Sequence, residues 1–105
     1  MSIDLSTIRY RTYKVIDKGK LITCVTVATA FKEGDKSILF YGLAFKSKKD
    51  KLNRVIGKAV SRSRMIKYMY KVPAKPVGKT VNEFFKEWIL TILPHSFQKE
   101  TAEII

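Results

Sequence analysis

Acidic residues, cysteine and histidine are scarce in this sequence, and each shortage excludes a class of function. The 105 residues include 9 Asp and Glu against 21 Lys and Arg, with one cysteine and one histidine. A lone cysteine cannot form an internal disulfide, which fits a reducing compartment. We expect Cys24, inside an apolar run, to be a buried thiol and not a reactive one. One Cys and one His do not supply a metal site, so we predict no metal and no cofactor.

Long apolar runs are also missing. No run approaches the ~18 residues that a membrane span needs. The first residues, Met-Ser-Ile-Asp-Leu, lack the basic-then-apolar layout of a signal peptide. We therefore expect no membrane partner and a cytoplasmic location.

No combination of residues indicates catalysis. His95 stands alone after a proline, and Glu33 and Asp35 fall in a predicted turn. Gly78-Lys79-Thr80 resembles the end of a phosphate-binding loop, but Pro73 occupies the position of its first glycine, which argues against nucleotide binding. We predict that the protein is not an enzyme.

The excess of positive charge is large and uneven. The net charge is +12; residues 1–79 contribute 19 basic and 5 acidic side chains, or +14, and residues 80–105 contribute −2. Such a distribution indicates a polyanionic partner, most commonly nucleic acid. With 46% hydrophobic residues, the chain is apolar enough to fold as a single domain, residues 1–105.

Two alternating apolar runs predict the centre of an antiparallel sheet. Leu21–Phe31 is uncharged and rich in β-branched residues, and Ser37–Lys46 returns after Lys32–Lys36, a connection of hairpin length. Each run has a bulky face and a smaller one. Gly42 and Ala44 lie on the smaller face, where we expect the following helix to pack closely.

The stretch from Lys46 to Lys71 predicts a basic helix, Lys48–Tyr70. It holds ten Lys and Arg and one acidic residue, Asp50, which with Ser47 resembles a capping box. Apolar residues at helical spacing predict a stripe facing the core: Leu52, Val55, Ile56, Ala59, Val60 and Ile66. The small residues Gly57 and Ala59 suit a close approach to the sheet. Basic residues lie opposite the stripe: Lys51, Arg54, Lys58 and Arg62.

A second helix is predicted over Val81–Leu93. Thr80 and Glu83 form a capping box, and Pro94 ends the helix. Its apolar residues predict core packing, with a homodimer interface as the alternative: Phe84, Phe85, Trp88, Ile89 and Ile92.

The remaining stretches give weaker signals. Residues 8–13 alternate like a strand and place Arg9 and Arg11 on one face, although a short helix from Leu5 stays open. Asp17–Lys20 reads as a turn. Residues 72–79, with two prolines and a glycine, predict a stiff connector and neither a helix nor a central strand. Residues 95–105 give no clear signal.

Basic residues interleaved with aromatic ones favour nucleic-acid binding. Lys and Arg neutralise phosphates, and exposed aromatic rings stack on unpaired bases. The aromatic candidates are Tyr10, Tyr13, Phe40, Tyr41 and Phe45. The predicted phosphate contacts are Lys48, Lys49, Lys51, Arg54, Lys58, Arg62, Arg64, Lys67, Arg9 and Arg11. A basic but inert surface over an aromatic core is the alternative.

The run from Gly42 to Arg64 reads GLAFKSKKDKLNRVIGKAVSRSR and resembles a pattern in small, mostly uncharacterised bacteriophage proteins. There a strand ending G-x-A leads through an acidic residue into a helix with I-G-R/K-x-I/V-A/S and a closing arginine. The resemblance covers about a fifth of the chain and implies a phage or virus protein working inside an infected cell. Lys46 stands where such proteins often carry cysteine, so a role of that thiol does not transfer.

Together these observations predict an α+β fold in which a small antiparallel sheet, built on a β-hairpin, packs against two helices. The predicted function is non-enzymatic nucleic-acid binding with little sequence preference, by a viral accessory protein. An inhibitor or adaptor that binds a host protein, such as a nuclease, polymerase or defence component, is the alternative.

Overall fold

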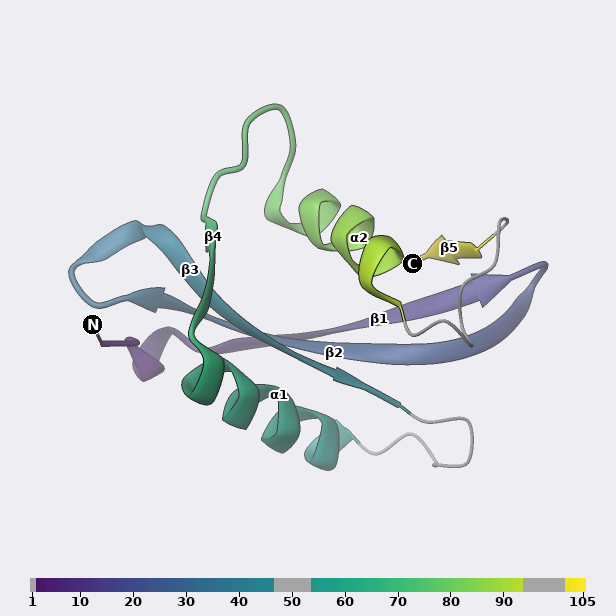
Figure 1. The fold of residues 1–105 in the computed structure, drawn as a ribbon, viewed down its shortest axis with the longest axis horizontal. Helices are drawn as coiled ribbons and strands as arrows, with labels where there is room; N and C mark the ends of the chain where they lie inside the picture. Colours follow the sequence, from purple (N-terminus) through teal and green to yellow (C-terminus); the bar gives the residue numbers. More distant parts are fainter. Residues whose placement is uncertain (1, 47–53, 94–101) are drawn as a thin grey trace.

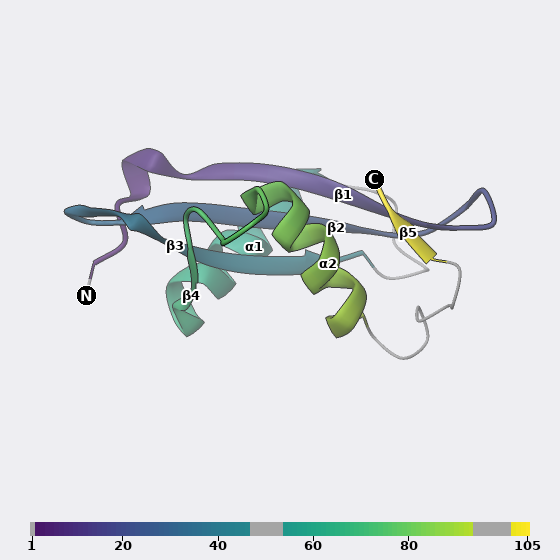
Figure 2. The ribbon, with the colours of Figure 1, turned by 90° about the horizontal axis from the view of Figure 1, so that it is seen from above.

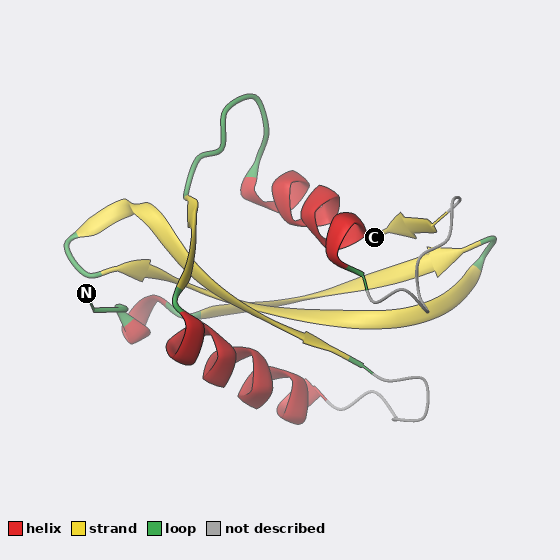
Figure 3. Ribbon diagram, viewed as in Figure 1, coloured by secondary structure: helices red, strands yellow, loops and turns green. Residues whose placement is uncertain are grey.

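The protein has an α+β fold, as predicted: a five-stranded antiparallel sheet with two α-helices (Figures 1 and 3). The computed structural model describes residues 2–46, 54–93 and 102–105. In chain order the elements are a 3-10 helix η1 (Leu5–Thr7), β1 (Arg9–Asp17), β2 (Lys20–Lys32), β3 (Asp35–Phe45), α1 (Arg54–Tyr68), β4 (Tyr70–Pro73), α2 (Val81–Ile92) and β5 (Ala102–Ile104).

Two tight hairpins build the sheet, whose strand order is β4-β3-β2-β1-β5. β1 and β2 are joined through Lys18 and Gly19, and both have positive φ angles, of 51° and 78°. β2 and β3 are joined through Glu33 and Gly34, and Gly34 has a φ of 74°. Glycine adopts this backbone region without steric cost, which is why both turns contain one. The second connection is shorter than the predicted Lys32–Lys36.

Each central strand has a bulky face and a small face because side chains alternate along a strand. In the register of β2 and β3, Val25 pairs with Phe45, Val27 with Leu43 and Thr29 with Tyr41 on one face. On the other face Ala28 pairs with Gly42 and Ala30 with Phe40. The two faces of the sheet therefore differ in how closely a helix can approach them.

α2 covers the bulky face. Its buried residues Phe85 and Ile89 join a core cluster with Tyr13, Val15 and Val25 of the sheet. The helix begins at the predicted cap, where Thr80 Oγ1 accepts a hydrogen bond from the Glu83 amide at 3.1 Å. This cluster forms the larger part of the hydrophobic core.

α1 covers the small face, on the opposite side of the sheet from α2 (Figures 1 and 2). A Cβ built on Gly42 would lie 2.1 Å from the Ser61 carbonyl oxygen, and one on Gly57 would lie 2.6 Å from Thr26 Oγ1. The helix backbone therefore rests almost directly on β3. Met65 is fully buried in the second cluster of the core, with Phe40 and two alanines of β2.

The prediction that the apolar stripe of α1 faces the core is wrong. The side turned to the sheet carries Gly57, Ser61 and Met65, whereas Val55 is 77% exposed and Ile56 60%. Ala59 is exposed as well. This face of the sheet is lined by glycine and alanine, so a helix can approach it closely only where the helix also carries small residues. Close packing of the two backbones therefore determines the orientation of α1. The basic residues thus lie beside exposed apolar ones, not opposite a buried stripe.

Further boundaries differ from the sequence predictions. Helix α1 ends at Tyr68 and not at 70, and the first residues of the predicted connector belong to β4, an edge strand. Proline is tolerated there because an edge strand needs no hydrogen-bond partner on its outer side. The C-terminal residues add β5 to β1, with Val15 paired to Ile104. Ser47, Asp50, Leu52 and His95 lie outside the described residues.

Candidate nucleic-acid interface

The cations predicted to contact phosphate divide between the two sides of the sheet. On α1 the exposed cations are Lys58, Arg62, Arg64 and Lys67. Arg9 and Arg11 are exposed on β1, on the side that α2 covers. Lys48, Lys49 and Lys51 lie outside the described residues, as does the side chain of Arg54. The structure therefore does not gather the predicted set into one surface.

Within the residues that the structure describes, no carboxylate pairs with the exposed cations of α1. Residues 54–68 contain no Asp or Glu. In the described part of the chain, none of the four forms an ion pair. Lys58 Nζ instead lies 5.5 Å from the centroid of the Tyr10 ring on β1, a cation–π geometry. We call Lys58, Arg62 and Lys67 the α1 cation row: Lys58 and Arg62 are one turn apart, and Lys67 lies at the C-terminal end, about half a turn around the helix from Lys58.

Arg64 has a structural contact that the sequence did not indicate. Its Nη1 donates a hydrogen bond of 2.8 Å to the Leu43 carbonyl oxygen. The pairing of β3 with β4 runs from Ile38 to Tyr41, so this carbonyl lies past the end of the described ladder. Arg64 thereby connects α1 to β3. One N–H group of its guanidinium is already used in this hydrogen bond, so fewer donors remain for a ligand.

Two exposed tyrosines next to the α1 cation row were missed by the sequence analysis. Tyr68 and Tyr70 are 50% and 55% exposed, and their rings stack with centroids 5.6 Å apart and planes 20° apart. Met69 between them has a φ of 52°, which turns the chain from helix into strand and brings the rings together. Lys67 Nζ lies 5.3 Å from the Tyr68 centroid. The signal for this pair was the Tyr-Met-Tyr sequence at the end of a basic helix.

Most aromatic residues proposed from the sequence for base stacking are unsuitable because they are buried. Tyr13, Phe40 and Tyr41 are each at most 8% exposed. Burial raises the pKa of Tyr41, opposed by a hydrogen bond with Trp88. Phe45 is partly buried against the core, and Tyr10 is partly buried under α1 and Lys58. The aromatic part of the candidate interface is therefore the Tyr68–Tyr70 pair.

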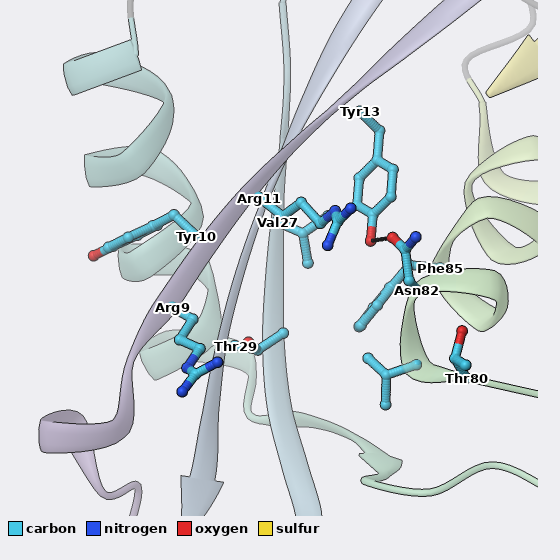
Figure 4. A pocket seen from close by; sticks show the side chains of 10 residues that line it. Arg9, Tyr10, Arg11, Tyr13, Val27, Thr29, Thr80, Asn82 and Phe85 are labelled. Atoms are coloured by element: carbon cyan, nitrogen blue, oxygen red, sulfur yellow. Dashed lines mark hydrogen bonds between the residues drawn. The ribbon is translucent and has the colours of Figure 1, made fainter. Parts of the chain in front are cut away.

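Arg9 and Arg11 line a hollow on the other side of the sheet (Figure 4). It encloses about 480 Å³ between β1, β2 and the start of α2. Tyr13 Oη donates a hydrogen bond of 2.7 Å to Asn82 Oδ1 across one wall. Burial raises the pKa of Tyr13, and the charge of Arg11 opposes this. The two arginines are thus separated from the α1 cation row by the sheet itself.

The α2 residues predicted as core or dimer contacts divide by exposure. Phe85 and Ile89 are buried in the core, and Phe84 and Ile92 are partly buried. Trp88 is 36% exposed and stacks on Phe84 with ring centroids 6.5 Å apart. Trp88 and Leu90 are the exposed large apolar residues of α2, so a second copy of the chain would have to contact these.

The described residues hold no cluster of three His, Cys, Asp or Glu side chains, and no described helix is long and apolar enough to cross a membrane. Cys24 is a buried free thiol, as predicted. No protein-family model, curated protein or solved structure significantly matches the chain.

Proposed function

We propose that this protein binds single-stranded nucleic acid without catalysing a reaction, through the α1 cation row and the Tyr68–Tyr70 pair. The observation that supports this most is the contact of Lys67 with Tyr68, because it puts a cation and an exposed stacked aromatic pair at one end of a basic helix. The resemblance to phage proteins supports a viral accessory role in the cytoplasm of the host cell.

The tyrosine pair favours single strands over duplexes. Every base has a π face, so an aromatic ring stacks on an unpaired base with little sequence preference, whereas the bases of a duplex are already stacked. Tyr68 and Tyr70 expose half of their surface at a place that cations flank. A strand that passes α1 can place phosphates on the helix and a base on the rings.

The phosphate contacts are tested by removing the α1 cation row. The variant K58Q/R62Q/K67Q should lose most of its affinity for single-stranded DNA or RNA. Each phosphate contact with a single strand contributes about −0.7 to the slope of log K against log salt, so the slope should flatten by about 2. The matched control K20Q/K36Q/K75Q removes the same charge at exposed positions away from α1. Equal losses in both variants would mean that only net charge matters, and would contradict an interface on α1.

The stacking contact is tested at Tyr68. The variant Y68A should weaken binding to single strands by about 1–3 kcal/mol, while Y68F keeps the ring and should bind normally. Binding to duplex DNA, measured in the same titration, should change little in either variant. If Y68A binds single strands as tightly as the unaltered protein, the tyrosine pair is not part of the interface.

A second candidate function is supported by the exposed apolar residues of α1. Val55 and Ile56 are among the most exposed large apolar side chains described, and in the sequence they lie between the cations Arg54 and Lys58. A partner that is both acidic and apolar, such as an acidic surface of a host nuclease or polymerase, would contact both kinds of residue. The variant V55S/I56S separates the two functions. It should leave nucleic-acid binding intact, but abolish capture of a host protein that survives nuclease treatment of the lysate.

A further inference from the structure

The hollow on the α2 side of the sheet is large enough to hold a small molecule. Its volume of about 480 Å³ lies within the range of about 300–1,000 Å³ that is usual for small-molecule pockets. Side chains from β1, β2 and α2 converge on it, and Figure 4 shows Arg9 and Arg11 extending to its side of β1 while Tyr10 extends to the other. We call it the Arg9–Arg11 hollow.

Its polar lining is positive and uncompensated. Neither guanidinium forms an ion pair within the described part of the chain, and none of the ten lining residues is acidic. Arg11 Cζ lies 5.8 Å from the Tyr13 ring centroid, so its guanidinium rests against an aromatic wall. The first residues of α2, which carry backbone N–H groups without partners inside the helix, close the far side. Two unpaired guanidiniums facing one concavity favour an anion.

The charge selects the class of anion. Two guanidiniums carry +2 and a helix N-terminus adds about half a charge. A phosphate monoester carries about −1.5 to −2 at neutral pH and accepts several hydrogen bonds, whereas a single carboxylate would leave one arginine unbalanced.

The rest of the lining selects what the phosphate is attached to. Val27, Val81 and Phe85 form an apolar floor beside the Tyr13 ring. The volume is many times the ~30 Å³ that one water takes in the liquid, so a bare phosphate leaves most of the hollow unfilled. We propose that the Arg9–Arg11 hollow binds a phosphate monoester joined to a flat ring, with the phosphate on the two guanidiniums and the ring on the apolar floor.

This site is distinct from the α1 cation row because the sheet separates them. Tyr70 lies on the same face of the sheet as Arg9, but β3 and β2 stand between the two residues. Two sources supply the same chemistry: a free mononucleotide or aryl phosphate, and the phosphorylated end of a nucleic-acid strand. Competition distinguishes them. A 5′-phosphorylated oligonucleotide that displaces the free ligand, when its 5′-hydroxyl counterpart does not, identifies the strand end as a source.

The direct test is calorimetric titration of the full chain at low salt with adenosine monophosphate, phenyl phosphate, inorganic phosphate and adenosine. Both ring-bearing phosphates should bind more tightly than inorganic phosphate, and adenosine should bind weakest. R9Q and R11Q should each weaken binding about tenfold or more, because each removes a charge-assisted contact. K14Q is the matched control: the same charge is removed from the same strand, on the other face.

The outcomes separate this proposal from the proposed function. K58Q/R62Q/K67Q should bind adenosine monophosphate normally, and R9Q/R11Q should bind a 5′-hydroxyl oligonucleotide normally. The proposal is overturned if no ring-bearing phosphate binds more tightly than ~1 mM. It is equally overturned if K14Q weakens binding as much as R9Q or R11Q, since net charge alone would then explain the affinity.

Discussion

Gly42 lies directly against the backbone of α1, and it has no room for a side chain. In G42A the new methyl group would collide with backbone atoms of Ser61 and Met65, so the helix must move away from β3. We expect a loss of about 1–3 kcal/mol or more in the free energy of unfolding, measured by urea denaturation. Truncating Met65 as well should not restore stability, because the colliding atoms belong to the backbone.

Gly57 provides the matched comparison. Its nearest neighbour is the Thr26 side chain, and alanine is favoured over glycine in a helix by about 1 kcal/mol. G57A should therefore cost much less than G42A, and its cost should fall further in a T26A background. Equal costs for G42A and G57A, or rescue of G42A by side-chain truncation, would contradict the close backbone packing.

Because of Tyr13, we expect the free energy of unfolding to fall in alkaline solution. Burial raises the pKa of its phenol in the folded protein, so folding favours the neutral form. The associated stability is complete below the unfolded pKa of about 10 and is lost as pH rises through the folded pKa. Y13F should lose the hydrogen bond to Asn82, at about 0.5–1.5 kcal/mol at neutral pH, but should show a smaller decline in alkaline solution.

Denaturant unfolding at a series of pH values checks this prediction, with Y68F as the control at an exposed phenol. If Y13F and the unaltered protein decline in parallel above pH ~10, Tyr13 is not the group responsible.

At the scale of elements, the apolar residues of α2 belong to one predicted helical stripe but differ in how deeply they are buried. F85A should cost about 3–5 kcal/mol because the ring is buried against Tyr41, with ring centroids 5.4 Å apart. W88A should cost less, because over a third of that side chain is exposed. L90A, at an exposed position of the same helix, is the control and should cost under 1 kcal/mol. Thermal or urea unfolding of the three variants gives the ranking, and a larger loss in W88A than in F85A would contradict it.

The sequence predicts elements well where local chemistry decides them. The alternation in β2 and β3 identifies both faces of the sheet, and Thr80 with Glu83 marks the start of α2. The orientation of α1 was not predicted because it depends on the side-chain sizes of two elements at once. The small residues of the helix pack against the face of the sheet that also carries small residues. Considered alone, the hydrophobic stripe of Val55 and Ile56 predicts that these residues face the core, which is the reverse of the observed orientation. β4 and β5 are too short to produce a pattern.

The candidate site shows the same limit. Charge identified Lys58, Arg62 and Lys67 on the basic helix, but charge along a chain does not reveal on which side of a sheet a residue lies. Arg9 and Arg11 were therefore predicted as phosphate contacts together with the α1 cations, although the sheet separates them. The Tyr68–Tyr70 pair depends on a positive φ at Met69, and a methionine in the sequence does not indicate a positive φ.

At the scale of the whole molecule, the two helices lie on opposite faces, which changes the basis of the dimer prediction. Two helices that shared one face of the sheet would leave more apolar surface of α2 uncovered than the observed arrangement does. The structure buries Phe85 and Ile89 and narrows the available surface to Trp88, Leu90 and their surroundings. A homodimer through this surface stays a prediction.

Salt gives this dimer a test that is independent of its affinity for ligands. Two copies that each carry +12 repel one another, and salt screens that repulsion while leaving apolar contact intact. Dimerisation should therefore strengthen with salt, whereas nucleic-acid binding should weaken. Sedimentation at tens of micromolar protein, in low and high salt, measures it, and W88A should sediment as a folded monomer. An unaltered protein that stays monomeric in both salts excludes the dimer, and leaves Trp88 as a half-covered residue at the edge of the core.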